Sequence, residues 1–227
     1  TVYREGEHDY LEFDTARQMV ENPTVEYRML ADDIGYISVA SFYDVTADQY
    51  KAAVEDLKSQ GMKGLIVDLR DNPGGLLTTV VDMLDYMLPE GKLVYTEDKD
   101  GNILEEFDST DEEQFTLPLV VMINENSASA SEIYAGAIKD YGAGKLVGIQ
   151  TFGKGIVQRI FDLGDGSALK LTIAKYFTPN GNDIHEIGVA PDVEVELSDE
   201  AKEATILDET NDNQLQKGIE VLKEEMK

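Results

Sequence analysis

The sequence of 227 residues contains no cysteine and only two histidines. Without cysteine the chain has no disulfide bond, no thiolate zinc site and no cysteine nucleophile. The two histidines, His8 and His185, are too few for a histidine-rich metal centre. We therefore expect neither a metal ion nor a cofactor.

Basic residues are scarce as well. The chain has 19 lysines and arginines against 46 acidic residues, a formal net charge of −27. This charge argues against nucleic acid and anionic membranes as partners, so a neutral or cationic substrate is expected. No apolar run reaches the roughly 18 residues that span a bilayer, and the first residues lack the apolar core of a signal peptide. Because the chain starts with Thr1 rather than Met, we expect it to be part of a longer protein.

Short apolar runs alternate with helical patterns along the chain. Buried strands are predicted at Ile34–Ala40, Gly64–Leu69, Leu117–Ile123 and Lys145–Ile149. Helices are predicted at Thr46–Gln60, Leu77–Leu88 and Ala130–Tyr141. Two antiparallel strands are predicted at Val157–Leu163 and Ala168–Tyr176. This order predicts an α/β fold in which helices flank a mixed β-sheet.

Three further segments have simpler patterns. The first twenty residues alternate like a hairpin, and Glu105–Glu113 reads as an acidic loop in solvent. The tail Asp199–Lys227 has apolar residues at helical spacing, which predicts a terminal helix without a catalytic role. We therefore divide the chain into a terminal segment (1–20), a core (21–198) and a helical tail (199–227).

The turn Asp71–Gly75 (DNPGG) joins a predicted buried strand to a predicted helix. Loops at this position of an α/β sheet often carry function. Two adjacent glycines also allow backbone N–H groups to face a cleft, where they can stabilise an oxyanion. Taken alone, such a Pro-Gly turn is more often an ordinary connection.

Three serines alternate after the third buried strand: Ser127, Ser129 and Ser131. Ser129 and Glu132 form an S-x-x-E pattern, which is typical of a capping box at a helix N-terminus. A nucleophile at the same place would gain from the N–H donors and the positive end of the helix dipole. The spacing leaves both interpretations open, and it does not choose among the three serines.

Lys154 stands between two glycines in the segment Thr151–Gln158 (TFGKGIVQ). A lysine amine can serve as the general base for a serine when burial lowers its pKa. The neighbours Phe152, Ile156 and Val157 are apolar, so we expect a desolvated lysine here.

The segment Gly148–Lys154 also fits the first seven positions of a phosphate-binding P-loop. Gly155 occupies the place of the hydroxyl residue that would hold magnesium, and a strand is predicted where a P-loop needs a helix. Phosphate binding is therefore disfavoured.

Several segments together resemble the carboxyl-terminal processing protease family, whose members are serine peptidases with a serine–lysine dyad. They are GLIVDLRDNPGG, NENSASASEIYAGAIKD, TFGKGIVQ, DGSALKLTIAKYFTPNG and IGVAPD, in order between about Val25 and Val195. The resemblance implies a crotonase- or Clp-like peptidase core with a β-strand extension.

The resemblance also implies a role for individual residues. Ser129 would be the nucleophile and Lys154 the general base. Gln158 would position the lysine side chain. The oxyanion hole would pair the backbone N–H of Ala130 with that of Gly75 or Gly74.

The implied function is a serine endopeptidase that cleaves polypeptides near their C-termini through an acyl-enzyme. Its partners would be polypeptide substrates, and the full-length protein would act outside the cytoplasm, in the cell envelope or secreted. Whether the chain forms a homo-oligomer stays open. The alternative is a non-catalytic peptide- or ligand-binding domain on the same fold.

Three features depart from the family pattern or stand apart from it. Family members usually carry a PDZ domain, of which Thr1–Arg17 resembles only the last strands. Asn126 stands where glycine is common, and we expect it to be tolerated, because asparagine can adopt the left-handed backbone that a glycine would. His185 is expected in a surface loop rather than in catalysis.

Overall fold

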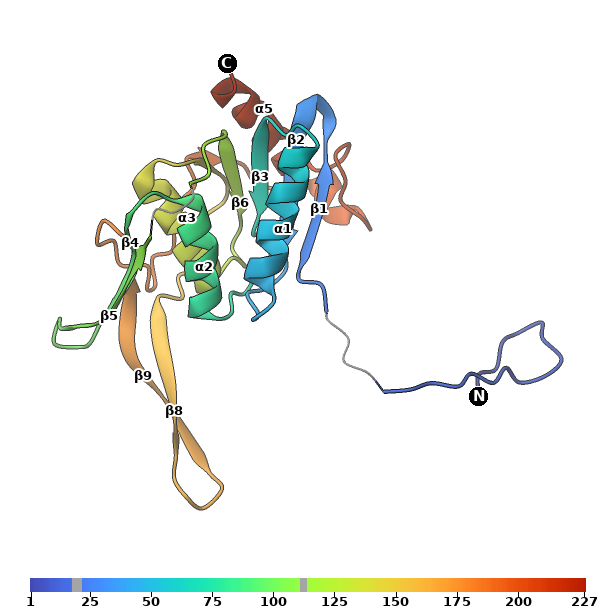
Figure 1. The fold of residues 1–227 in the computed structure, drawn as a ribbon, viewed down its shortest axis with the longest axis horizontal. Helices are drawn as coiled ribbons and strands as arrows, with labels where there is room; N and C mark the ends of the chain where they lie inside the picture. Colours follow the sequence, from blue (N-terminus) through green and yellow to red (C-terminus); the bar gives the residue numbers. More distant parts are fainter. Residues whose placement is uncertain (18–21, 111–113) are drawn as a thin grey trace.

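The computed structural model describes residues 1–17, 22–110 and 114–227. Its centre is a six-stranded sheet in the order β1-β2-β3-β6-β7-β10 (Figure 1). The strands are β1 (Val25–Met29), β2 (Ile34–Val39), β3 (Gly64–Asp68), β6 (Leu119–Ile123), β7 (Lys145–Gly148) and β10 (Val193–Glu194). β1 pairs antiparallel with β2, and every other pair in this sheet is parallel.

Helices cover both faces of this sheet. One face packs against α1 (Thr46–Ser59), α2 (Leu77–Met87) and α3 (Ala130–Tyr141), and the other against α5 (Asn213–Glu225). Successive residues of β3 alternate between the two layers: Leu65 and Val67 join the α1–α3 side, while Ile66 joins the α5 side. Both faces are buried, which explains why these strands are apolar throughout. The described residues also form two short helices, η1 (Ala31–Asp33) and α4 (Asp199–Glu203).

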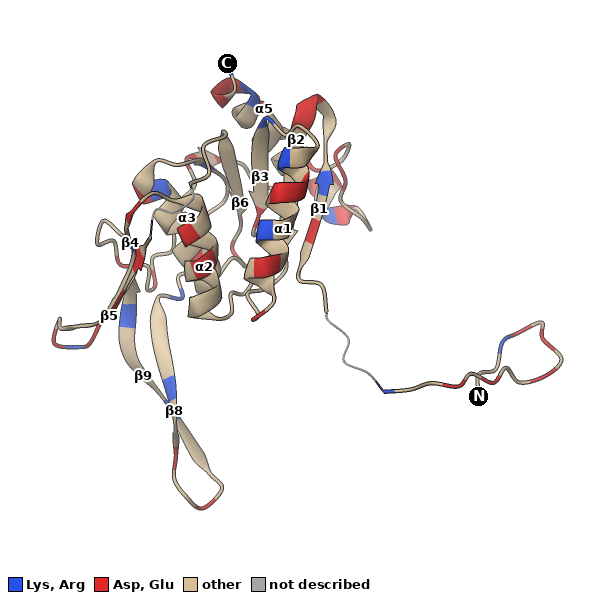
Figure 2. Cartoon of the chain, viewed as in Figure 1, with Lys and Arg blue, Asp and Glu red and all other residues tan. Residues whose placement is uncertain are grey.

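A second, four-stranded sheet is antiparallel and has the order β5-β4-β9-β8. Its strands are β4 (Gly91–Glu97), β5 (Ile103–Ser109), β8 (Ile156–Asp162) and β9 (Ala168–Phe177). The β8–β9 hairpin projects away from the body of the molecule (Figure 1). Figure 2 shows acidic residues on α1, α2 and the turns, whereas β8 and β9 are mostly uncharged.

The predicted α/β fold with a mixed sheet is confirmed, but three local predictions differ from the structure. Residues 105–109 belong to strand β5 rather than to a solvated loop; 111–113 of that prediction lie outside the described residues. β5 is the outer strand of its sheet, where charged side chains can remain in water while the backbone pairs with β4.

The predicted tail helix is interrupted. Helix α4 ends at Glu203, and α5 begins after Asp212, whose carboxylate caps it by accepting the Leu215 N–H at 2.9 Å. At the other end of the chain, the predicted hairpin is reduced to one bridge between Val2 and Leu11, and residues 18–20 lie outside the described part. Among the described residues no helix is long and apolar enough to cross a membrane.

Candidate active site

Three loops of the predicted site meet at one edge of the central sheet. The double-glycine turn follows β3, the serine segment follows β6, and the lysine loop follows β7. These strands are parallel neighbours, so their carboxyl ends lie side by side. This is the edge at which α/β sheets carry their ligand and catalytic sites.

Ser129 occupies the N-cap position of α3 with φ 56° and ψ −114°. A positive φ is uncommon for a residue other than glycine, and such strain is concentrated at functional sites. The Glu132 carboxylate accepts the Ser129 backbone N–H at 2.8 Å, as the predicted capping pattern requires. The serine therefore caps the helix in a strained conformation, at the end where N–H groups and the helix dipole favour negative charge.

The other two serines of the segment are fully buried and serve the backbone. The Ser127 hydroxyl donates to Leu69 O at 2.7 Å, and the Ser131 hydroxyl donates to Asn72 O at 2.9 Å. Ser129 is only half-buried. Of the three side chains, Ser129 is thus the one that the surface can reach.

The double-glycine turn lies directly against Ser129. A Cβ atom on Gly74 would stand 2.9 Å from Ser129 Cβ and 3.0 Å from Ala130 N, and the φ of Gly74 is 99°, so only glycine fits. The Gly74 N–H is already used, because it donates to Asn72 Oδ1 at 2.9 Å. This leaves Gly75, which is exposed, as the glycine whose N–H has no hydrogen-bond acceptor among the described residues.

Glu132 joins the serine segment to the lysine loop. Its carboxylate is fully buried. One oxygen, Oε2, accepts the backbone N–H groups of Ser129 and Lys154, each at 2.8 Å. The other, Oε1, accepts the Thr151 hydroxyl and the Gly153 N–H, each at 2.6 Å. An ionised carboxylate accepts about four hydrogen bonds, so all its acceptor positions are filled.

The lysine itself is not buried. Lys154 is exposed, and so is Phe152, two residues before it, at 66%. The prediction of a desolvated lysine is therefore wrong for the free chain, although its backbone is held firmly. The apolar neighbours lie beside the loop without covering the side chain, because Ile156 and Val157 already belong to the projecting hairpin.

A fourth loop, residues 183–189, supports the lysine loop through hydrogen bonds. The Glu186 N–H donates to Gly153 O at 2.9 Å, and the Val189 N–H donates to the Thr151 hydroxyl at 2.7 Å. A Cβ atom on Gly155 would overlap the backbone of His185, so the glycine after the lysine is required for this close approach. His185 is half-buried and contributes its backbone to this packing.

Two other predicted features differ in placement. Gln158 lies in β8 with an exposed side chain, and no hydrogen bond joins it to Lys154. Asn126 has no positive φ, so this position does not use the left-handed backbone that asparagine tolerates; its side chain donates to Asp71 Oδ1 at 2.7 Å. The strand β8 after the lysine loop agrees with the argument against a P-loop.

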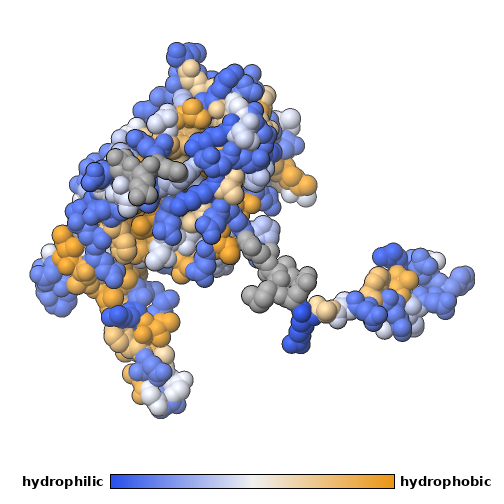
Figure 3. All heavy atoms as spheres, in the orientation of Figure 1, coloured by the Kyte–Doolittle hydropathy of each residue, from blue (hydrophilic) through white to orange (hydrophobic). Residues whose placement is uncertain are grey.

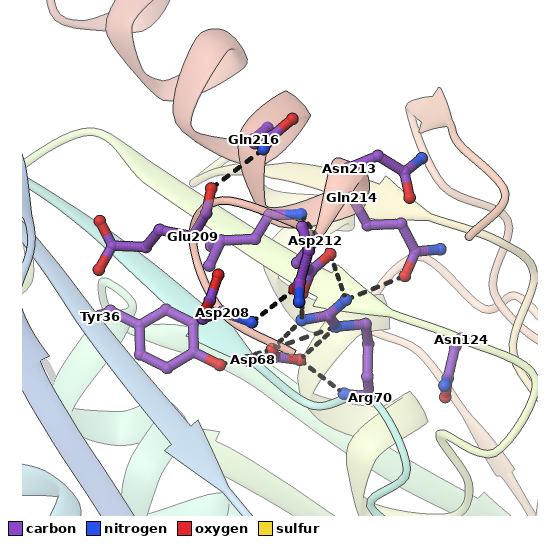
Figure 4. Close-up of polar contacts among 12 residues, drawn as sticks. Tyr36, Asp68, Arg70, Asn124, Asp208, Glu209, Asp212, Asn213, Gln214 and Gln216 are labelled. Atoms are coloured by element: carbon purple, nitrogen blue, oxygen red, sulfur yellow. Dashed lines mark hydrogen bonds and ion pairs between the residues drawn. The ribbon is translucent and has the colours of Figure 1, made fainter. Parts of the chain in front are cut away.

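An ionic cluster beside the double-glycine turn had no signal in the motifs (Figure 4). The Arg70 guanidinium binds Asp68 at 2.6 Å and Asp212 at 2.7 Å, and all three side chains are nearly buried. Tyr36 donates to Asp68 at 2.7 Å. Asp212 in the C-terminal tail thus anchors Arg70, the residue before the double-glycine turn. Asp212 is the N-cap of α5, and recognising it as a helix start would have been the available sequence signal for this residue.

These loops provide parts that an acyl-transfer site needs: an accessible serine hydroxyl, a lysine on the adjoining loop, and two N–H groups, those of Gly75 and Ala130, that have no acceptor among the described residues. Residues 33–195 match the model of peptidase family S41. The chain belongs to peptidase family S41. The predicted resemblance to carboxyl-terminal processing proteases is confirmed by the relatives of this S41 chain.

A carboxy-terminal-processing protease of Bartonella bacilliformis is 40% identical over 205 residues, which are 86% of this chain and 46% of the relative. A carboxyl-terminal-processing protease of Synechocystis is 42% identical over 194 residues, 82% of this chain and 44% of that protein. The chain thus spans less than half the length of these curated relatives.

Solved structures agree with this assignment. The photosystem II D1 C-terminal processing protease has a TM-score of 0.73 at 36% identity, covering 79% of this chain and 50% of that one. A putative S41 protease from Bacteroides fragilis also has a TM-score of 0.73, at 18% identity, covering 92% and 59% of the two chains. The second similarity concerns the fold alone.

Proposed function

We propose that this S41 chain carries the catalytic site of a serine endopeptidase of the carboxyl-terminal processing type. The observation that carries the proposal is the shared acceptor Glu132 Oε2. Because it binds the backbone N–H groups of both Ser129 and Lys154, the two nitrogens lie no farther apart than those two hydrogen bonds allow. A nucleophile and a candidate base are thus held on adjoining loops.

In the proposed reaction the Ser129 hydroxyl attacks the scissile carbonyl carbon while the neutral Lys154 amine takes the hydroxyl proton. The N–H groups of Gly75 and Ala130 hold the resulting oxyanion. The protonated lysine then gives its proton to the leaving amine, and an acyl-enzyme remains. Lys154 next takes a proton from water, whose attack releases the acid and restores Ser129.

Because Lys154 is exposed in the free chain, the bound substrate itself is proposed to shield the lysine amine from water. A base must be neutral, and desolvation disfavours the charged ammonium. A polypeptide lying over the lysine loop removes water from the amine, with Phe152 providing apolar surface beside it. Gln158, four residues later, is proposed to orient the amine once the site is covered.

The wider setting follows from the relatives. Two of them are named chloroplastic C-terminal processing peptidases. We propose polypeptide C-terminal segments as substrates, an extracytoplasmic location for the full-length protein, and the division into segments 1–20, 21–198 and 199–227. A non-catalytic binding role would leave the strain at Ser129 and the free N–H pair without a purpose.

The test is covalent labelling with a fluorophosphonate probe. The wild-type chain is expected to be labelled, whereas Ser129→Ala and Lys154→Ala lose labelling. Ser167→Ala and Lys99→Ala, which change exposed residues on distant turns, are the matched controls and stay labelled. Absence of labelling in the wild type, or labelling that persists in Ser129→Ala, contradicts the proposal.

A further inference from the structure

The outer strand of the projecting hairpin is unpaired on one side. β8 is the last strand of its sheet, and among the described strands it pairs with β9 only. An open edge offers N–H and C=O groups to any extended chain, so proteins usually cover it or blunt it with lysine or proline. The sequence of β8, IVQRIFD, contains neither residue; its charged residues are Arg159 and Asp162.

Two hydrogen bonds define which backbone groups of the strand face outward. At its start the Tyr176 N–H donates to Gly155 O at 2.9 Å, and beyond its end the Leu163 N–H donates to Ser167 O at 3.0 Å. Bonded residues alternate along an antiparallel pair, and both bonded positions on the β8 side, Gly155 and Leu163, are odd-numbered. The register shift between Val157 and Gln158 places its extra residue in β9, so the alternation within β8 is unbroken. The even-numbered residues therefore direct their N–H and C=O groups to the open edge: Ile156, Gln158 and Ile160.

This edge begins at the candidate active site. Ile156 follows Lys154 by two residues, and the strand leads from there out along the hairpin (Figure 1). A polypeptide whose scissile bond lies between Ser129 and Lys154 therefore continues past the first open N–H and C=O groups of β8.

The surroundings suit an apolar, extended chain. Ile160 is 68% exposed, and Figure 3 shows apolar atoms along the hairpin. Other exposed apolar residues of the hairpin are Phe161, Leu163, Leu169 and Leu171. A cavity of about 370 Å³ lies over the face of this four-stranded sheet and is lined by residues of β4, β5, β8 and β9, among them Leu104, Gln158 and Ile173.

We propose that the open edge of β8 is the substrate-docking strand, to which a polypeptide adds as a further strand through the backbone groups of Ile156, Gln158 and Ile160. The proposal rests on the proposed peptidase function and specifies its substrate as an extended, locally unfolded segment. Main-chain pairing supplies the affinity, and alternate side chains of the added strand supply selectivity. The hairpin thus favours substrates that are extended, and the side chains of the substrate have a secondary effect on binding.

The first experiment scans the substrate. Casein peptides retained by the Ser129→Ala variant are identified by mass spectrometry, and one is synthesised with single N-methyl groups at successive positions. Each methyl group removes one N–H donor, so Kd is expected to rise about three- to tenfold at every second position and to stay unchanged between them. A rise in Kd that is uniform along the peptide, or an unchanged Kd at every position, overturns the proposal.

The second experiment changes the edge. Ile160→Pro removes an outward N–H group without touching the bonds to β9, and Ile160→Val is the matched control that keeps the group. We expect KM for casein to rise about three- to tenfold in Ile160→Pro alone, with fluorophosphonate labelling unchanged in both. If gel filtration instead shows a dimer that Ile160→Pro dissociates while KM is unaltered, a second copy occupies the edge and the proposal is wrong.

The two proposals fail separately. Loss of the peptidase function shows as absent labelling and absent casein cleavage in the wild type. The N-methyl scan measures binding to an inactive variant, so its alternating pattern tests the docking edge in either case.

Discussion

Replacement of Glu132 by glutamine is the sharpest test of how the site is held together. The carboxylate accepts four hydrogen bonds and is fully buried. A glutamine has one oxygen and one NH₂ group, so two of the four donors would face another donor. The least costly orientation keeps the amide oxygen on Ser129 and Lys154 and turns the NH₂ group toward Thr151 and Gly153.

The cost can be worked from these contacts. The Thr151 hydroxyl already accepts the Val189 N–H, and its second lone pair can accept from the NH₂ group, but its own proton then loses the Glu132 acceptor. The Gly153 N–H is left buried without an acceptor, at about 1 to 3 kcal/mol. The hydrogen bonds that remain lose their charge assistance. We therefore expect Glu132→Gln to lower the free energy of unfolding by about 2 to 4 kcal/mol. Glu132→Ala, which removes all four acceptor contacts, should cost at least about 4 kcal/mol.

Activity should fall more than stability alone explains. The lysine loop would shift relative to the serine, and a misplacement of about 1 Å costs on the order of a hundredfold in rate. Urea unfolding and the rate of fluorophosphonate labelling are the two assays. Glu125→Gln, an exposed change in the same segment, is the matched control and should alter neither. If Glu132→Gln keeps the labelling rate within about twofold and the stability within about 0.5 kcal/mol, the bridging role is refuted.

Arg70→Met leaves two buried carboxylates unpaired and should lower the free energy of unfolding by about 3 to 5 kcal/mol in urea titrations; a loss within about 0.5 kcal/mol would argue against the anchoring of the tail. Gly155→Ala overlaps the backbone of His185 and should slow labelling at least about tenfold, and an unchanged rate would contradict the support of the lysine loop by 183–189. Burial acts to raise the pKa of Asp183, but Lys175 and the His185 N–H outweigh it, so the folded pKa lies below the ordinary 3.8. The stabilisation that Asp183 contributes is present above the unfolded pKa and is lost as pH falls through the lower folded pKa. In thermal unfolding between about pH 5 and 2, the wild type should therefore lose stability relative to Asp183→Asn. Parallel curves of melting temperature against pH for the two proteins would contradict this.

The local patterns predicted the fold well where a segment is apolar on both faces or strictly amphipathic. The runs at β3, β6 and β7 and the helices that follow them were recognisable because their periodicity is a local property. The acidic segment 105–109 was misread because an outer strand needs no apolar pattern when its partner supplies the hydrogen bonds.

The site residues show a similar division. Ser129, Lys154 and the double glycine were marked by residue type and by the family resemblance. The role of Glu132 was visible only as half of a capping box, since its contacts to the lysine loop join residues about twenty positions apart. The burial expected for Lys154 was wrong because apolar neighbours in sequence do not cover a side chain whose loop leads into a projecting hairpin.

By itself the sequence determined the chemistry available to this protein: a chain without cysteine, rich in carboxylates, with a serine, a lysine and paired glycines at the ends of apolar runs. The tertiary structure decided how that chemistry is arranged. The parallel order β3-β6-β7 brings three loops to one edge, buries the hydroxyls of Ser127 and Ser131 and leaves that of Ser129 accessible. The physical reason is that hydrogen bonding and burial depend on which strands become neighbours, and strand order is a property of the whole sheet.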